Sequence, residues 1–225
     1  MKLGLVLECD SGGPDELVLT CMARRLAPDI SVECVALGSK EQVFLKGPEA
    51  AEQLVTASGC DLVLIVWDLK PYWEKAAAKN CEAEAELLRK KLSGLPGKTK
   101  AKIKLLCLTW ELETWLIADD RAIKKHLSTD AHKLKYKCRS PLDKHDAKAF
   151  LDGVCKTQRG PSRRYVDVRE AIRIAQLIPD TTKIQGIPSY GRFAGLVCGN
   201  SNAAFQQCGD VCNDLAYQAQ QLGRR

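Results

Sequence analysis

Acidic side chains follow apolar stretches at three places in this sequence, and together they could hold a metal ion. These acids are Glu8, Asp68, Glu111 and Glu113. Mg²⁺ and Mn²⁺ prefer oxygen ligands, and two or three convergent carboxylates suffice for a site. Bound ions of this kind can activate a water molecule and stabilise the leaving oxygen of a phosphodiester. The pattern therefore favours metal-dependent hydrolysis, provided that the fold brings the acids together.

The apolar stretch 60–68 predicts the strand around which a sheet is organised. It is rich in β-branched residues and ends on Asp68. Such a short continuous apolar run is typical of a strand that is buried on both faces of a parallel sheet. Ligands of open α/β sheets bind beyond the carboxyl ends of the strands. Asp68 therefore lies where an α/β protein would bind its ligand.

Strands and helices alternate through the first half of the chain. We predict strands at 3–7, 30–37, 60–68 and 103–109, helices at 14–26, 48–58 and 73–93, and a basic linker at 96–100. This alternation is the signature of a parallel α/β sheet. If the strands are parallel neighbours, the acids that follow them meet at one edge. Asp15 and Glu16, at the start of the first helix, could reach the same edge.

The second half of the chain is expected to be helical. Thr109 is predicted to cap a helix that starts at Trp110, and further short helices are predicted at 121–127, 146–155, 168–178 and 189–198. The composition, 28% charged and 45% hydrophobic, is that of a globular protein. We therefore predict an α/β fold, a mostly parallel sheet flanked by helices. Residues 1–120 would form this core, and residues 121–225 a basic, mainly helical part packed on it.

Each acid also has a purely structural explanation. An acid in the first turn of a helix complements the helix dipole, a contribution of ~0.3–1 kcal/mol. This explanation applies to Asp15, Glu16, Glu111 and Glu113. Glu8 and Asp68 could cap the turns that follow their strands, although a carboxylate directly after a buried strand needs a partner or solvent.

The acidic strand ends resemble the Toprim fold, the α/β domain of topoisomerases, primases and overcoming-lysogenization-defect nucleases. More narrowly, the chain is similar to a family of bacterial Toprim-like proteins that are often predicted to work beside AAA-type ATPases in phage-defence operons. The residues that carry the resemblance are Leu5-Val6-Leu7-Glu8 with Asp15-Glu16-Leu17, Val63-Leu64-Ile65-Val66-Trp67-Asp68, Glu111-Leu112-Glu113-Thr114-Trp115-Leu116-Ile117-Ala118-Asp119, and Pro188-Ser189-Tyr190-Gly191-Arg192-Phe193.

The resemblance implies roles for individual residues. Glu8 resembles the Toprim glutamate, a metal ligand or general acid/base, and Asp68 matches the first acid of an Asp-x-Asp pair. The sequence departs from the family at the second acid, where it has Lys70. An ammonium group there removes a ligand and repels a cation. A two-metal site then needs Glu111, Glu113 or Asp15 as a substitute, whereas Lys70 could contact a phosphate directly.

Positive charge is concentrated in the second half of the chain. The net charge is +6, yet residues 1–100 contain 13 Lys and Arg against 15 Asp and Glu, and residues 121–173 contain 15 against 6. Basic side chains with occasional aromatic neighbours suit a nucleic-acid backbone. The candidates for this contact are Lys124, Lys125, Lys135, Lys137, Arg163 and Arg164. A solvated face or a surface for an acidic partner protein is the alternative, because the segment contains no recognised binding motif.

The eleven cysteines do not form a recognisable metal or disulfide pattern. Those at 21, 34, 60, 81 and 107 lie singly in apolar stretches, so we expect free, buried thiols there. Cys208 and Cys212 lie one helical turn apart, but no second pair completes a zinc set. Reduced thiols, together with the lack of a signal peptide or membrane segment, lead us to expect a cytoplasmic protein.

Two functions from different classes are compatible with these features. The first is a Mg²⁺- or Mn²⁺-dependent nuclease in phage defence, with Glu8 and Lys70 in catalysis and metal ligands from Asp68, Glu111, Glu113 and Asp15. The second is a catalytically degenerate Toprim-like module that binds or senses a ligand beside an AAA-type ATPase, and Lys70 is its main support. The chain has no phosphate-binding loop of the Gly-x-x-x-x-Gly-Lys-Ser/Thr type, so any ATPase activity would come from that partner.

Overall fold

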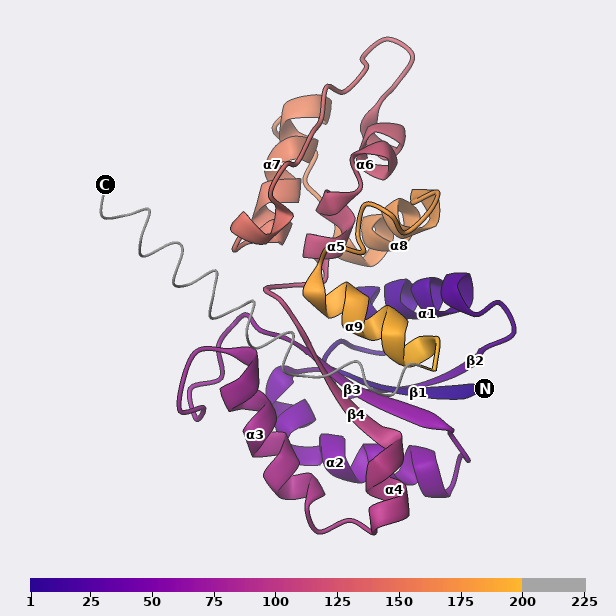
Figure 1. The fold of residues 1–225 in the computed structure, drawn as a ribbon. Helices are drawn as coiled ribbons and strands as arrows, with labels where there is room; N and C mark the ends of the chain where they lie inside the picture. The colour runs from indigo at the N-terminus through magenta and orange to yellow at the C-terminus, as the bar shows by residue number, and fades with distance from the viewer. Residues whose placement is uncertain (200–225) are drawn as a thin grey trace.

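The computed structural model describes residues 1–199 and confirms the predicted α/β class (Figure 1). Its sheet contains four parallel strands in the order β2-β1-β3-β4. The strands are β1 (Lys2–Leu7), β2 (Ser31–Ala36), β3 (Leu62–Asp68) and β4 (Ile103–Leu108). The helices are α1 (Pro14–Leu26), α2 (Lys40–Thr56), α3 (Cys81–Leu92), α4 (Gly97–Lys102), α5 (Glu113–Ala118), α6 (Asp120–Leu127), α7 (Ala147–Arg159), α8 (Asp167–Leu177) and α9 (Pro188–Val197), with a 3-10 turn at Pro141–Asp143.

Both faces of the sheet are covered by helices, as the continuous apolar strands require. Side chains alternate between the faces along each strand. In β3, Val63 and Ile65 pack with α2 and α3, whereas Leu64 and Val66 pack with α1 and the C-terminal helices. Figure 1 shows α2, α3 and α4 on one side of the sheet, and α1 and α9 on the other. Helices α5 to α8 form a group beyond this second layer.

The second helix begins earlier than the sequence predicted. Its first residue is Lys40, because Ser39 Oγ accepts a hydrogen bond from the Gln42 N–H at 3.3 Å and caps the helix. Pro48, the predicted start, lies inside the helix. A proline in a helix interior loses one backbone hydrogen bond, so the sequence alone favoured a start at this residue.

The third helix is shorter than predicted, and the segment after it, predicted as a linker, is largely helical. α3 begins at Cys81 rather than at residue 73, because Asn80 Oδ1 accepts a hydrogen bond from the Ala83 N–H at 2.8 Å. This side-chain cap ends a loop that leads from β3. The segment predicted as a basic linker, 96–100, falls largely in the short helix α4.

The turn after β4 also differs from the prediction. Thr109 does not cap a helix, and its buried Oγ1 has no hydrogen-bond partner in the described structure. Trp110 has a φ of 67°, a left-handed conformation that residues other than glycine seldom adopt. The α-helix therefore starts at Glu113, three residues later than predicted.

Two of the cysteines expected to be free thiols are joined by a disulfide. Cys81 at the start of α3 bonds to Cys107 of β4, with 5.7 Å between their Cα atoms. Both side chains belong to the core on the α2 and α3 side of the sheet, which explains how residues 26 apart in sequence meet. Cys21, Cys34 and Cys60 are free thiols, as predicted, but only Cys60 is fully buried and the other two are half-buried. Positions 208 and 212 lie outside the described residues.

Helices are the only regular elements in the described length of the C-terminal part. Between residue 120 and residue 199 the structure contains helices and loops but no strand. Its apolar side chains join those of the sheet in one cluster that runs from Leu3 to Val197. Across residues 1–199, no helix combines the length and the apolar character that crossing a membrane would require.

Candidate functional site

The carboxyl ends of three neighbouring strands carry the acids that the sequence singled out. Glu8 follows β1, Asp68 ends β3, and the loop after β4 contains Glu111. The pKa of Asp68 lies well above its ordinary value, first because of burial and then because of the negative charges of Glu8, Asp15, Glu113 and Glu111. The fold therefore places the other four acids where their negative charges act on Asp68.

Three buried oxygen atoms at this edge lack a hydrogen-bond partner within the described residues. They are Glu8 Oε2, Asp68 Oδ1 and Thr109 Oγ1, and each stands at the end of a strand. An unsatisfied buried polar atom costs about 1–3 kcal/mol. A cation bound between Glu8 and Asp68 would satisfy two of these atoms, so the residues present fit a hard divalent ion.

The edge does not, however, present a complete set of protein ligands. Among residues 1–199, no three His, Cys, Asp or Glu side chains are arranged to hold one metal ion. Mg²⁺ is commonly held by one or two carboxylates, with water and substrate phosphate oxygens completing its shell. The arrangement therefore suits Mg²⁺ or Mn²⁺ better than an ion that needs three or four protein ligands.

Burial also raises the pKa of Glu8, Asp15 and Glu113. It brings the pKa of Glu8 to about 8, helped by the charge of Asp15 and opposed by the charge of Lys40. The pKa of Asp15 rises to about 6, and that of Glu113 to about 7, in both cases mainly through burial. A nearby positive charge would stabilise the ionised form of these carboxyl groups. A divalent cation carries the largest such charge that the site could bind.

A cavity of about 660 Å³ opens beside Glu8. Its wall includes Lys40 from α2 and the aromatic rings of Tyr72 and Trp73 from the loop after β3. This volume lies within the range of small-molecule sites. The acidic edge is thus bordered by a recess with apolar surface and one buried ammonium group.

A buried ion pair holds the loop that leaves Asp68. Lys40 Nζ donates hydrogen bonds to the carbonyl oxygens of Leu69 at 3.0 Å and Pro71 at 2.7 Å, and to Glu84 at 2.9 Å. Glu84 also accepts a hydrogen bond from the Trp73 N–H at 2.6 Å. Because both charged side chains are buried, this network fixes the path of the chain from Asp68 to Trp73.

Lys70 lies in this loop and contacts an aromatic ring. Its Nζ lies 5.6 Å from the ring centroid of Trp110, and its N–H donates to the Trp110 carbonyl at 3.1 Å. A cation over a tryptophan face is attracted by the ring. Lys70 is thereby held next to the turn that carries Glu111, and its catalytic role stays a prediction.

Helices α7 and α8 and the loop between them supply site residues that the sequence did not reveal. The Lys148 N–H donates to Glu111 Oε2 at 3.0 Å, and Lys148 Nζ forms an ion pair with Asp167. Burial raises the pKa of Glu113, and the positive charge of Lys148 partly offsets this rise. The hydroxyl of Tyr165 donates to Glu113 Oε1 at 3.3 Å. No local pattern marks these residues, because they lie 37 and 52 positions from their partners.

The predicted nucleic-acid contacts fall into separate groups. Lys124 is occupied by Asp120, with 2.7 Å between their charged atoms, whereas Lys125, Lys135 and Lys137 are exposed. Arg163 and Arg164 line a separate pocket.

Comparison with known proteins finds no family model that matches the chain, and no significant similarity to a curated protein or to a solved structure.

Proposed function

We propose that the protein is a Mg²⁺- or Mn²⁺-dependent phosphodiesterase that cleaves nucleic acid at the carboxyl edge of the sheet. The observation that carries this proposal is a pair of buried oxygens, one of Glu8 and one of Asp68, that have no hydrogen-bond partner within residues 1–199. They lie at the ends of adjacent strands, where the charges of further acids act on Asp68. The metal would be held by these two side chains. Asp15, Glu111 and Glu113, whose charges act on Asp68, would contribute to the shell through water.

Residues of the chain would contribute in distinct ways. A bound ion would supply an activated water and stabilise charge on the phosphodiester. Lys148 and Tyr165 orient Glu111 and Glu113 through their hydrogen bonds. Lys70, which lies over the Trp110 ring, offers a positive charge that would attract a substrate phosphate. The exposed lysines at 125, 135 and 137 would hold the nucleic-acid backbone, so binding should weaken as salt rises.

Cleavage assays with the full chain test the proposal. Plasmid DNA, single-stranded DNA and tRNA are incubated with the pure protein and Mg²⁺ or Mn²⁺. We expect cleavage of at least one substrate, and a loss of at least a hundredfold in Asp68→Asn and in Glu8→Gln. Glu49→Gln, which removes an exposed carboxylate on α2, is the matched control and should cleave normally. Absence of cleavage with all three substrates, or unchanged cleavage in Glu8→Gln, would contradict the proposal.

The competing function is a degenerate binding or sensor module that works with an AAA-type ATPase. Two observations favour it: Lys70 replaces an acid of the Toprim pattern, and the described residues offer no set of three ligands. Calorimetric titration with Mn²⁺ separates the two functions. A nuclease should have a Mn²⁺ site that Asp68→Asn abolishes, whereas a degenerate module should have none.

A further inference from the structure

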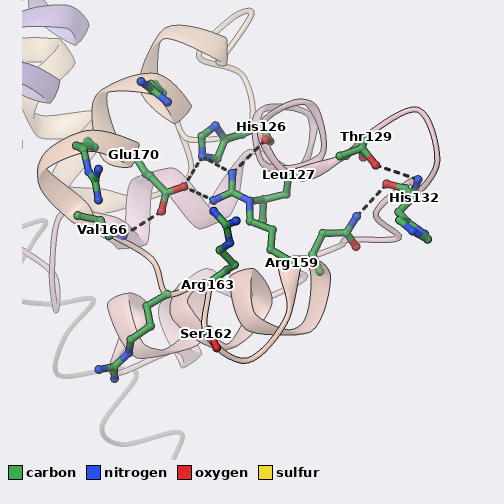
Figure 2. Close-up of a pocket in the computed structure, with 14 residues that line it drawn as sticks. His126, Leu127, Thr129, His132, Arg159, Ser162, Arg163, Val166 and Glu170 are labelled. Atoms are coloured by element: carbon green, nitrogen blue, oxygen red, sulfur yellow. Dashed lines mark hydrogen bonds and ion pairs between the residues drawn. The ribbon is translucent and has the colours of Figure 1, made fainter.

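A second cavity, of about 890 Å³, lies among α6, α7, α8 and their loops (Figure 2). Guanidinium groups dominate its wall, so we call it the arginine pocket. Its basic residues are Arg159, Arg163, Arg164, Arg169 and Arg173, with His126 and His132. Within the described lining, Glu170 is the only carboxylate. The pocket therefore has a large excess of positive charge in a volume that suits a small molecule.

The single carboxylate is already fully engaged by the protein. Glu170 Oε1 pairs with Arg159 and lies 3.1 Å from His126 Nε2. Glu170 Oε2 accepts a hydrogen bond from the Val166 N–H at 2.9 Å. Figure 2 shows these side chains pointing to one centre, with Arg163 directed toward it from the loop after α7. Glu170 thus neutralises Arg159 and is itself held in place by these contacts. The other arginines of the pocket remain available to an external anion.

The remaining arginines are poorly compensated. The exposed side chain of Arg164 lies 3.7 Å from Asp152, which is a long ion pair. In the part of the chain that the structure describes, Arg163, Arg169 and Arg173 have no carboxylate within ion-pair distance. Guanidinium groups that line one pocket repel one another, and their planar donors match phosphate oxygens in a two-pronged geometry. An anion with several phosphate groups would relieve the repulsion and satisfy these donors.

We propose that the arginine pocket binds a triphosphate chain, either free or as part of a nucleoside triphosphate. The lining carries five arginines against one glutamate, and a triphosphate chain carries a comparable negative charge in a compact form. A nucleic-acid strand would instead need an open groove and aromatic rings for its bases. The described lining contains no Trp, Tyr or Phe, so the compact ligand is the better match.

The pocket is separate from the acidic edge. α7 carries Lys148 in its first turn, next to Glu111, and Arg159 at its last residue, in the pocket. At 1.5 Å per residue, these two positions are roughly 16 Å apart. Binding at the arginine pocket therefore does not depend on a metal at the acidic edge, and it can be measured in the presence of a chelator.

Calorimetric titration of the full chain in EDTA tests this inference. The ligands are sodium tripolyphosphate, ATP, orthophosphate and a short single-stranded oligonucleotide. We expect tripolyphosphate and ATP to bind at least tenfold more tightly than orthophosphate or the oligonucleotide. If tripolyphosphate and ATP bind with equal affinity, the pocket recognises the phosphate chain alone. If ATP binds more tightly, the pocket also contacts the nucleoside.

Matched variants assign the binding to the pocket. Arg163→Gln and Arg169→Gln alter exposed side chains that pair with no described carboxylate, and each should lower the affinity for tripolyphosphate at least tenfold. Arg24→Gln, an exposed arginine of α1, should leave it unchanged, as should Asp68→Asn. The inference is overturned if tripolyphosphate and ATP do not bind, if the oligonucleotide binds as tightly, or if both pocket variants retain full affinity.

Discussion

The carboxylate of Glu8 stands out among individual side chains because the fold opposes its ionisation. Burial and the charge of Asp15 raise its pKa to about 8 from an ordinary value of 4.5. The folded protein therefore binds more protons than the unfolded chain between these pH values. It follows that Glu8 costs stability progressively as the pH rises from about 4.5 to about 8, unless a cation is bound.

This linkage predicts a pH-dependent effect of Glu8→Gln in EDTA. At pH 8.5 the variant should be more stable than the wild type by on the order of 1–2 kcal/mol, because it lacks the buried charge. At pH 5 the two proteins should have similar stability, since Glu8 is then protonated in the folded state. Urea denaturation at both pH values measures the difference. An equal gain at pH 5 and pH 8.5 would show that ionisation of Glu8 is not its cause.

Single residues were predictable where their position in the sequence fixed their position in space. Glu8 directly follows β1 and Asp68 ends β3, and parallel strands end at a common edge, so their proximity could be inferred. Lys148 and Tyr165 reach the acids only through the packing of α7 and its neighbouring loop. The sequence marked Lys148 only as one charge of a basic segment. Tertiary contacts of this kind leave no local signal.

At the scale of elements, strands were easier to predict than the starts of helices. A buried strand appears as an apolar run, and all four strands lie close to their predicted positions. Helix starts depend on side-chain caps such as Ser39 and Asn80, which compete with other signals in the sequence. The disulfide between Cys81 and Cys107 was missed for a related reason, because it depends on how α3 packs on β4.

The loop between β3 and α3 gives a prediction at this scale. Lys40→Met should lower the free energy of unfolding by about 3 kcal/mol, because it leaves the buried Glu84 charge without its cation. The same change should loosen the loop that carries Lys70. Lys46→Met, at an exposed position of the same helix, is the matched control and should have little effect. Urea denaturation compares the three proteins, and equal stability of the two variants would contradict this role for the ion pair.

Across the whole molecule, the two predicted parts of the chain share one apolar core. Trp115 of α5 is fully buried, and its Nε1 donates to Ser189 Oγ of α9 at 2.9 Å. Its ring lies 5.1 Å from that of Tyr190 and 5.5 Å from that of Phe193. The side chain of Arg192 donates to the carbonyl of Leu105 in β4 at 3.0 Å. Residues beyond 120 therefore complete the cover of the sheet.

This shared core predicts that the first 120 residues do not fold alone. Cutting the chain there would expose Trp115 and the apolar face of α1, which packs against α8 and α9. Burying such side chains stabilises a protein by roughly 1.5–3 kcal/mol each, so the loss exceeds the net stability of an ordinary domain. We expect the fragment to aggregate or to lack near-ultraviolet circular dichroism, and the full chain to unfold in one calorimetric transition. A fragment of residues 1–120 that unfolds cooperatively would instead identify the sheet as an independent domain with helices added to it.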